Sequence, residues 1–98
     1  MSNPIAILSA MRTPMGGMMG SLSSLSASDL GGVAIRSAIS KSGLNASDID
    51  EVLMGSVLTA GQGQAPARQA ALAAGLPVST PCTTVNKVCG SAMKSIML

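Results

Sequence analysis

At residues 84–95 the sequence reads TVNKVCGSAMKS, a stretch in which a short strand-like segment gives way to a helix. Cys89 lies at the turn between the two predicted elements. A cysteine at a helix N-terminus has its thiolate stabilised by unpaired backbone N–H groups and by the helix dipole. The stretch therefore makes Cys89 a candidate nucleophile. On these residues alone a buried core cysteine is an equally good interpretation, because free cysteines are among the most buried residue types.

The residues after Cys89 favour access to its sulfur. Gly90, Ser91 and Ala92 are small, so that an acyl group meets no bulky side chain, and the N–H groups of the first helical turn can stabilise negative charge. The second cysteine, Cys82, is interpreted as a small buried apolar residue. The spacing of the two cysteines and the absence of His predict no metal site, and we expect no disulfide.

Outward from this stretch, apolar runs alternate with punctuated helical segments. Ser28 and Asp29 supply a cap and a first-turn acid for one helix, and Pro66 opens another at its first position. The predicted order is a strand over 5–8, a loop over 12–28, a helix over 28–43, a strand over 51–58, a helix over 66–74, a strand over 82–86 and a helix from Cys89 onward. Strands that alternate with helices predict an α/β fold, a mostly parallel sheet with covering helices.

The composition excludes several classes of protein. Six basic and four acidic residues give a net charge of +2, and the basic residues are dispersed, so we expect no nucleic-acid partner and no membrane patch. No run approaches the roughly 18 apolar residues of a membrane span. Neither a signal peptide nor an Arg-rich targeting segment is evident, so the sequence predicts a cytoplasmic protein. Phe, Tyr, Trp and His are all absent, whereas Met occurs eight times, which predicts a thin, adaptable core.

Two glycine patterns invite a nucleotide-binding interpretation. They are Gly16-Gly17-Met18-Met19-Gly20 and Gly61-Gln62-Gly63-Gln64. Neither gives the full G-x-G-x-x-G between a strand and a helix, and no P-loop lysine follows either one. Ordinary loop glycines are the favoured interpretation.

Four segments of the chain resemble thiolases, in the same order along the chain. They are Arg12-Thr13-Pro14 with the Gly-rich loop after it, the run over 52–58, the run over 61–71, and the Val-Asn-Lys-Val-Cys-Gly-Ser stretch over 85–91. The resemblance is closest to the acetyl-CoA acetyltransferase branch. Three positions depart from the family pattern. Ala92 stands where the family usually has Gly, and Met15 and Met18 stand where many relatives have Phe, which predicts conserved apolar volume in the loop.

The resemblance implies an acyltransferase in which Cys89 takes an acetyl group from acetyl-CoA as a thioester. A second acetyl-CoA, deprotonated at its methyl carbon, then attacks it and gives acetoacetyl-CoA and CoA, reversibly. Coenzyme A thioesters are substrates here, so no cofactor is implied. The family forms homotetramers, as dimers of dimers, and its catalytic His residues and second Cys lie in later segments.

The chain reads on to Met97-Leu98 within a helical pattern, without a cap. Residues 1–98 are therefore expected to be an incomplete N-terminal thiolase domain that carries the nucleophile, with the C-terminal half absent. Alone, such a piece should be inactive and should expose a sheet edge and an apolar helix stripe. Two alternatives remain: a degradative 3-ketoacyl-CoA thiolase, and a non-catalytic structural or interaction unit.

Overall fold

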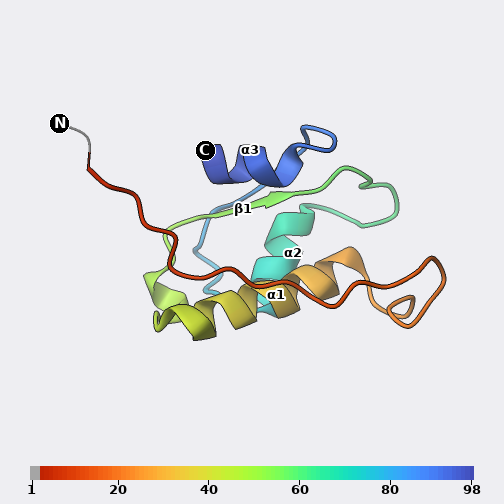
Figure 1. The fold of residues 1–98 in the computed structure, drawn as a ribbon, viewed down its shortest axis with the longest axis horizontal. Coiled ribbons are helices and arrows are strands. Elements are labelled where there is room, and N and C mark those ends of the chain that lie inside the picture. Colours follow the sequence, from red (N-terminus) through yellow and green to blue (C-terminus); the bar gives the residue numbers. More distant parts are fainter. Residues whose placement is uncertain (1–2) are drawn as a thin grey trace.

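A computed structural model describes residues 3–98 and contains helices on both faces of a small sheet (Figure 1). None of the helices in this range is both long and apolar enough to cross a membrane. The elements are α1 (Ala27–Ser42), a short 3-10 helix η1 (Ala46–Asp48), β1 (Val52–Gly55), α2 (Pro66–Ala73), β2 (Cys82–Val85) and α3 (Ser91–Met97). This order of helices and strands confirms the predicted α/β class.

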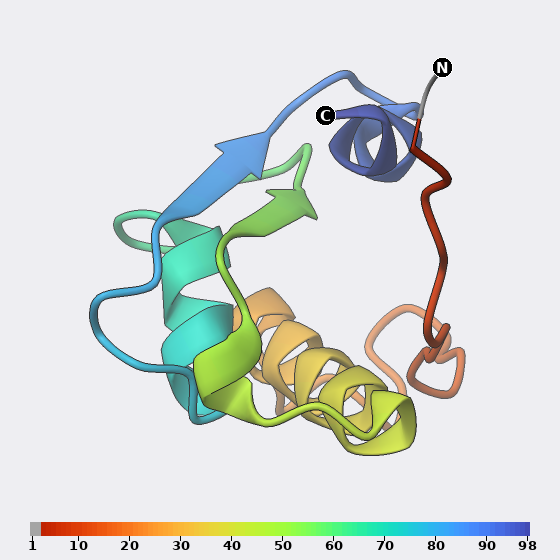
Figure 2. The same cartoon turned by 90° about the vertical axis from the view of Figure 1, so that its left-hand side faces the viewer.

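Strands β1 and β2 pair in parallel, with Val52 opposite Cys82 and Gly55 opposite Val85. Helix α2 makes the crossover between them, as parallel pairing requires. Two views show α1 and α2 on one face of this sheet and α3 on the other (Figures 1 and 2). The Thr84 hydroxyl on β2 accepts a hydrogen bond of 3.0 Å from the backbone N–H of Ala67, so the sheet itself caps the start of α2.

Helix α1 begins two residues earlier than predicted, because Ser26 rather than Ser28 is its N-cap. The Ser26 hydroxyl accepts from the Asp29 N–H, and the Asp29 carboxylate accepts from the Ser26 N–H, both at 3.0 Å. These two bonds form a reciprocal capping box. The backbone hydrogen bond from Ser26, and then that from its side chain, hold the pKa of Asp29 below its usual value. Gly43 ends the helix with φ +80°, as predicted.

Small residues bring α1 and α2 into close contact. A Cβ atom placed on Gly32 would lie 2.9 Å from the Ala73 Cβ, and one on Gly31 would lie 3.1 Å from the Ala70 Cβ. The Arg36 guanidinium on α1 also donates to the Ala73 carbonyl at 2.7 Å. The two helices therefore pack backbone to backbone, in a contact that larger side chains would separate.

The core lies between this helix pair and the sheet. Among the described residues no large side chain is fully buried, which agrees with the thin core predicted from the composition. The buried cluster of the core consists of Val52, Ala71, Ala74 and Leu76. Partly buried apolar residues pack against this cluster, among them Ile35, Ile39, Met54 and Cys82.

The predicted strand over 5–8 is not formed, which corrects the sequence interpretation. Ile5, Ile7 and Leu8 are 96%, 79% and 60% exposed, and the segment runs on the side of β1 away from β2 without pairing to it (Figure 2). An apolar run becomes a strand only beside a neighbour that accepts its backbone hydrogen bonds. One tether holds the segment: the Ser9 hydroxyl donates to the Ala38 carbonyl of α1 at 2.7 Å.

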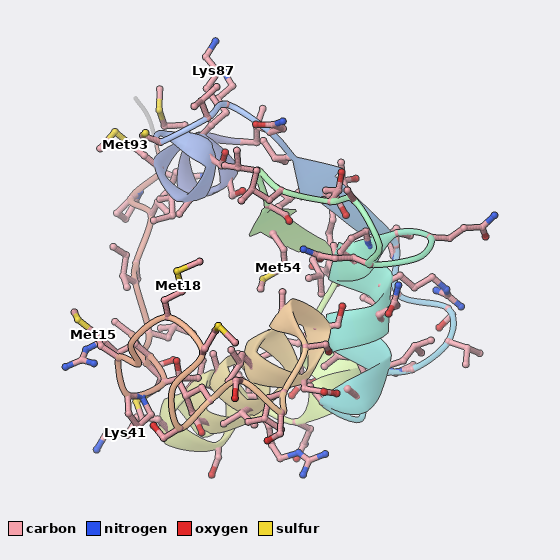
Figure 3. The ribbon with its side chains drawn as sticks, turned by 90° about the vertical axis from the view of Figure 1, so that its right-hand side faces the viewer. Met15, Met18, Lys41, Met54, Lys87 and Met93 are labelled. Carbon is pink, nitrogen blue, oxygen red and sulfur yellow. The ribbon has the colours of Figure 1, made fainter. Side chains whose placement is uncertain are left out.

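Methionines of the sheet and of the N-terminal loop differ in how exposed their side chains are. Met54 of β1 is partly buried, and its side chain points toward the side on which the N-terminal segment runs (Figure 3). Met15 and Met18 are 86% and 97% exposed, so neither side chain is packed in a core here. On α3, Met93 and Ile96 are exposed as well; the sequence predicted an exposed apolar helix stripe without assigning it to a particular helix.

Candidate functional site

Cys89 is exposed on the turn that joins β2 to α3. It lies two residues before the first residue of α3, with Gly90 as the N-cap, whereas the sequence placed it at the helix start. The helix therefore starts after Cys89, and the thiol is on the turn rather than in the first helical turn. The sulfur is thus open to solvent, which favours the nucleophile interpretation over that of a core cysteine.

Backbone hydrogen bonds close the turn around Cys89. The Gly90 N–H donates to the Lys87 carbonyl at 3.0 Å, and the Ser91 N–H donates to the Val88 carbonyl at 3.1 Å. Val88 has φ +49°, a left-handed conformation that is unusual for a β-branched residue. The turn therefore holds its backbone in a conformation that the sequence would not adopt without support.

Two side chains supply further hydrogen bonds to the turn. The Asn86 Oδ1 accepts from the Val88 N–H at 2.9 Å. The Ser91 hydroxyl accepts from the Lys87 N–H at 2.8 Å and donates to the Val88 carbonyl at 2.6 Å. Sequence reasoning missed these two roles. Asn and Ser beside a predicted turn were the available signal, since both bond readily to nearby backbone.

Gly55 at the end of β1 seats the start of α3. A Cβ atom on Gly55 would lie 2.7 Å from both the Ser91 carbonyl carbon and the Ala92 nitrogen. Backbone atoms at that distance must move to admit a side chain, so only glycine lets α3 approach the strand this closely. The turn with Cys89 is fixed against the sheet at this contact.

The environment of Cys82 differs from that of Cys89. It is partly buried on β2, packs against the core cluster and places its Sγ 3.3 Å from the Thr80 carbonyl. Both cysteines are free thiols. This placement supports the interpretation of Cys82 as a core residue.

The basic residues nearest in sequence to Cys89 are Lys87 and Lys94. Lys87 is exposed, and its side chain points outward from the molecule (Figure 3). Since the sequence contains no His, the 98 residues provide no imidazole to act as a general base for the thiol.

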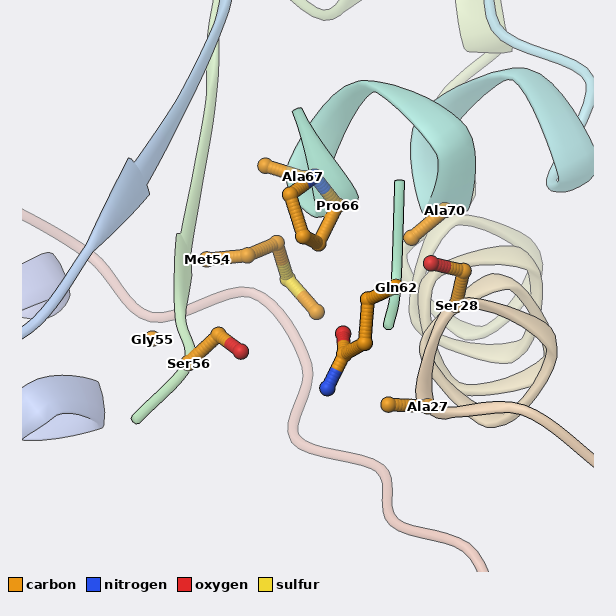
Figure 4. Close-up of a pocket in the computed structure, with 9 residues that line it drawn as sticks. All are labelled: Ala27, Ser28, Met54, Gly55, Ser56, Gln62, Pro66, Ala67 and Ala70. Atoms are coloured by element: carbon orange, nitrogen blue, oxygen red, sulfur yellow. The ribbon is translucent and has the colours of Figure 1, made fainter. Parts of the chain in front are cut away.

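A separate small pocket, of about 50 Å³, opens between the start of α1, the end of β1 and the start of α2 (Figure 4). Cys89 does not line it. Gln62 reaches into this pocket, and its Oε1 is buried without a hydrogen-bond partner among the described residues. A pocket of this volume suits one or a few water molecules rather than an acyl-CoA.

The loop that carries Gln62 contains one of the two glycine patterns. Gly61 and Gly63 have φ +75° and +80°, and the Gln69 side chain donates to the Gln62 and Gln64 carbonyls, both at 2.7 Å. The two glycines adopt the left-handed conformations that the loop requires, and Gln69 of α2 binds the loop carbonyls. This supports the interpretation as loop glycines.

Several known proteins are similar to this chain along almost its whole length. Acetyl-CoA acetyltransferase, mitochondrial, from Danio rerio is 60% identical over 96 residues, and the protein of that name from Bos taurus is 58% identical over 96 residues. These matches cover 98% of the chain but 23% of each relative, so the chain spans about a quarter of their length. The crystal structure of Acat5 thiolase from Ascaris suum in complex with coenzyme A superposes with a TM-score of 0.91 at 50% identity, over 93% of this chain and 24% of that one.

These relatives correct one expectation. The sequence predicted a cytoplasmic protein, yet the curated relatives are named as mitochondrial proteins, so that prediction is wrong. A targeting signal is read from a leader rather than from the folded domain, and residue composition within the domain does not report it.

The family comparison agrees with the geometry of the fold. The sequence model of the protein family "Thiolase, N-terminal domain" matches residues 5–98 of this chain. The matched range contains every helix and strand described above and the Cys89 turn. The chain therefore belongs to the thiolase family.

Proposed function

We propose that this chain is the nucleophile-bearing N-terminal part of an acetyl-CoA C-acetyltransferase, with Cys89 as the residue that accepts the acetyl group. The observation that carries the proposal is the exposed thiol on a hydrogen-bonded turn ahead of α3, in a chain of the thiolase family. The names of the curated relatives support the acetyl-CoA branch. Residues 1–98 form only part of the domain in this proposal.

The first chemical step follows from the thiol. The Cys89 thiolate attacks the carbonyl carbon of acetyl-CoA, a bond forms from Sγ to that carbon, and the bond from the carbon to the CoA sulfur breaks. CoA leaves as the thiol, with the proton that a base had taken from Cys89. No oxidation or reduction takes place, and the acetyl group is held as a thioester.

The second step makes or breaks a carbon–carbon bond. A second acetyl-CoA loses a methyl proton to a base, and its carbanion attacks the acetyl-Cys89 thioester to give acetoacetyl-CoA and the free thiolate. Both steps need general bases, which these 98 residues do not offer as His. We propose that the full-length protein is as long as its relatives. Its remaining residues would then supply the bases, most of the CoA contacts and the contacts that assemble a dimer of dimers. By the same analogy the full-length protein is proposed to be mitochondrial.

Substitution of the two cysteines in the full-length protein tests the proposal. Cys89→Ala should lower kcat for acetoacetyl-CoA thiolysis by at least about 1,000-fold, because the covalent route is lost. Cys82→Ala is the matched control and should keep kcat within about twofold. Mass spectrometry of the enzyme mixed with acetyl-CoA should find the acetyl group on Cys89. Near-normal activity in Cys89→Ala, or acetylation of Cys82 alone, would refute the assignment.

Chain-length profiles separate the proposed branch from a degradative 3-ketoacyl-CoA thiolase. The proposal expects thiolysis of acetoacetyl-CoA to exceed that of long 3-ketoacyl-CoA substrates in kcat/KM. Comparable values on both would favour the degradative alternative. No thiolysis of either substrate by the full-length protein would favour a non-catalytic unit.

A further inference from the structure

The turn before α3 holds one residue in an unfavourable backbone conformation. Val88 has φ +49°, and its branched Cβ makes this left-handed region costly. Cys89 follows Val88 directly, so the Val88–Cys89 peptide sets the direction in which the thiol leaves the backbone. If Val88 relaxed to a negative φ, this peptide would rotate and the sulfur would move.

Ser91 makes the hydrogen bonds that oppose this relaxation. Its hydroxyl accepts from the Lys87 N–H at 2.8 Å and donates to the Val88 carbonyl at 2.6 Å, so one side chain binds the Asn86–Lys87 peptide and the Val88–Cys89 peptide, which enclose Lys87 and Val88. Ser91 is only 5% exposed, and water therefore cannot readily replace its hydroxyl. These bonds fix the two ends of the Lys87–Val88 pair, and Asn86 binds the peptide between the two residues through the Val88 N–H.

The seat of Ser91 is rigid because β1 lies directly beneath it. A Cβ on Gly55 would lie 2.9 Å from the Ser91 Cβ and 2.7 Å from the Ser91 carbonyl carbon. The contact with β1 thus restrains the position of the Ser91 hydroxyl. From the exposed side, Asn86 Oδ1 accepts from the Val88 N–H at 2.9 Å and adds a second support.

We propose that Ser91 is a positioning residue for Cys89, which keeps Val88 left-handed and thereby aims the thiol, with Asn86 in a supporting role. This inference rests on the proposed function of Cys89 as the acetyl acceptor. Ser91 touches no reacting atom in this scheme and acts through the turn. Loss of its hydroxyl should lower kcat and leave KM nearly unchanged, because a displaced nucleophile lowers reactivity more than substrate binding.

The test compares Ser91→Ala with Ser91→Thr in the full-length enzyme. The acetylation burst counts the active sites, so that kcat is expressed per reactive thiol. Ser91→Ala should lower this kcat about 10- to 100-fold, with KM within twofold, while Ser91→Thr keeps the hydroxyl and should retain more of the rate than Ser91→Ala despite its additional methyl group. Ser95→Ala is the matched control, since its hydroxyl donates to the Ser91 carbonyl within α3 and not to the turn. Its kcat should equal that of the wild type.

A second pair keeps the test decisive if Ser91 variants fold poorly. Asn86 is exposed, so Asn86→Ala should fold normally and lower kcat per site about 3- to 10-fold, whereas Asn86→Asp retains the acceptor and the rate. Wild-type kcat per site in both alanine variants would overturn the inference. So would losses in Ser91→Ala that the Ser95→Ala control shares.

The two proposals fail in different ways. If Cys89→Ala remains active, the proposed function is wrong whatever Ser91 does. If Cys89→Ala is inactive but Ser91→Ala and Asn86→Ala react with wild-type kcat per site, the proposed function stands and only the positioning role falls.

Discussion

The two faces of the sheet differ in how they use small residues. On one face, Gly31 and Gly32 of α1 meet Ala70 and Ala73 of α2 in a close contact that holds no reactive group. On the other face, Gly55 brings α3 close to β1, and the result is an exposed thiol on a strained, hydrogen-bonded turn. The same device, a glycine at a close approach, thus serves stability on one face and the placement of Cys89 on the other.

Gly55→Ala should have the largest effect and should act on activity. Its Cβ would lie 2.7 Å from two backbone atoms of α3, so the helix start and the Cys89 turn must move. We expect kcat per folded enzyme to fall by about 100-fold or more, as for a nucleophile displaced by about 1 Å. Gly17→Ala is the control, because nothing lies within 4 Å of a Cβ at that position. Normal turnover in Gly55→Ala would remove the proposed contrast between the faces.

Gly32→Ala should act on stability instead. The new Cβ would lie 2.9 Å from the Ala73 Cβ, and overpacking of this kind costs about 1–3 kcal/mol, more than the gain of up to about 1 kcal/mol in helix propensity. We expect urea unfolding of the full-length protein to report a net loss of about 1 kcal/mol. Its kcat per active site should match that of the wild type; a parallel loss of kcat would show that the two faces are coupled.

Ser26→Ala tests the start of α1, farther along the same face. The substitution removes the hydroxyl that accepts from the Asp29 N–H, and loss of an N-cap costs about 1 kcal/mol. Urea midpoints of the wild type and the variant provide the measurement. Ser28→Ala is the matched control and should have little effect, since Ser28 lies inside the helix. A greater loss in Ser28→Ala would restore Ser28 as the cap.

Asp29→Asn gives the smallest effect, which depends on pH. Because the folded pKa lies below the usual value of 3.8, the carboxylate stabilises the fold above that pH, and the contribution disappears as pH falls through the folded pKa. The difference in urea midpoint between wild type and Asp29→Asn should therefore stay constant from about pH 7 to about pH 5 and shrink below about pH 4. A difference that grows in acid would contradict the capping box.

The elements with local punctuation were predictable from the sequence. Gly43 ends α1 and Pro66 begins α2 as expected, because a left-handed C-cap and a first-turn proline act within a few residues. β1 and β2 were placed correctly but are shorter than predicted, since strand ends depend on the pairing partner. The run over 5–8 has the composition of a strand and lacks a neighbour that pairs with it, which no local pattern reveals.

The candidate site was predictable in part. The sequence singled out Cys89 and its small neighbours; the structure shows an exposed thiol there, and the catalytic role stays a prediction. Asn86 and Ser91 beside the turn were a signal for side-chain bonds to nearby backbone, but nothing local showed that Val88 is left-handed or that α3 starts against Gly55. Contacts between residues 36 positions apart are set by the tertiary fold.

The pairing of β1 with β2 has a kinetic consequence. Cys82 pairs with Val52, 30 positions earlier, and the remaining pairs of the register have the same separation. Closure of so long a loop is entropically costly, so non-local pairing of this kind forms late relative to the local hydrogen bonds within α1 and α2. The Cys89 turn follows β2 and can reach its seat only after this pairing. During refolding, the thiol should therefore acquire its native reactivity with alkylating reagents in one of the last phases, after helical circular dichroism has recovered.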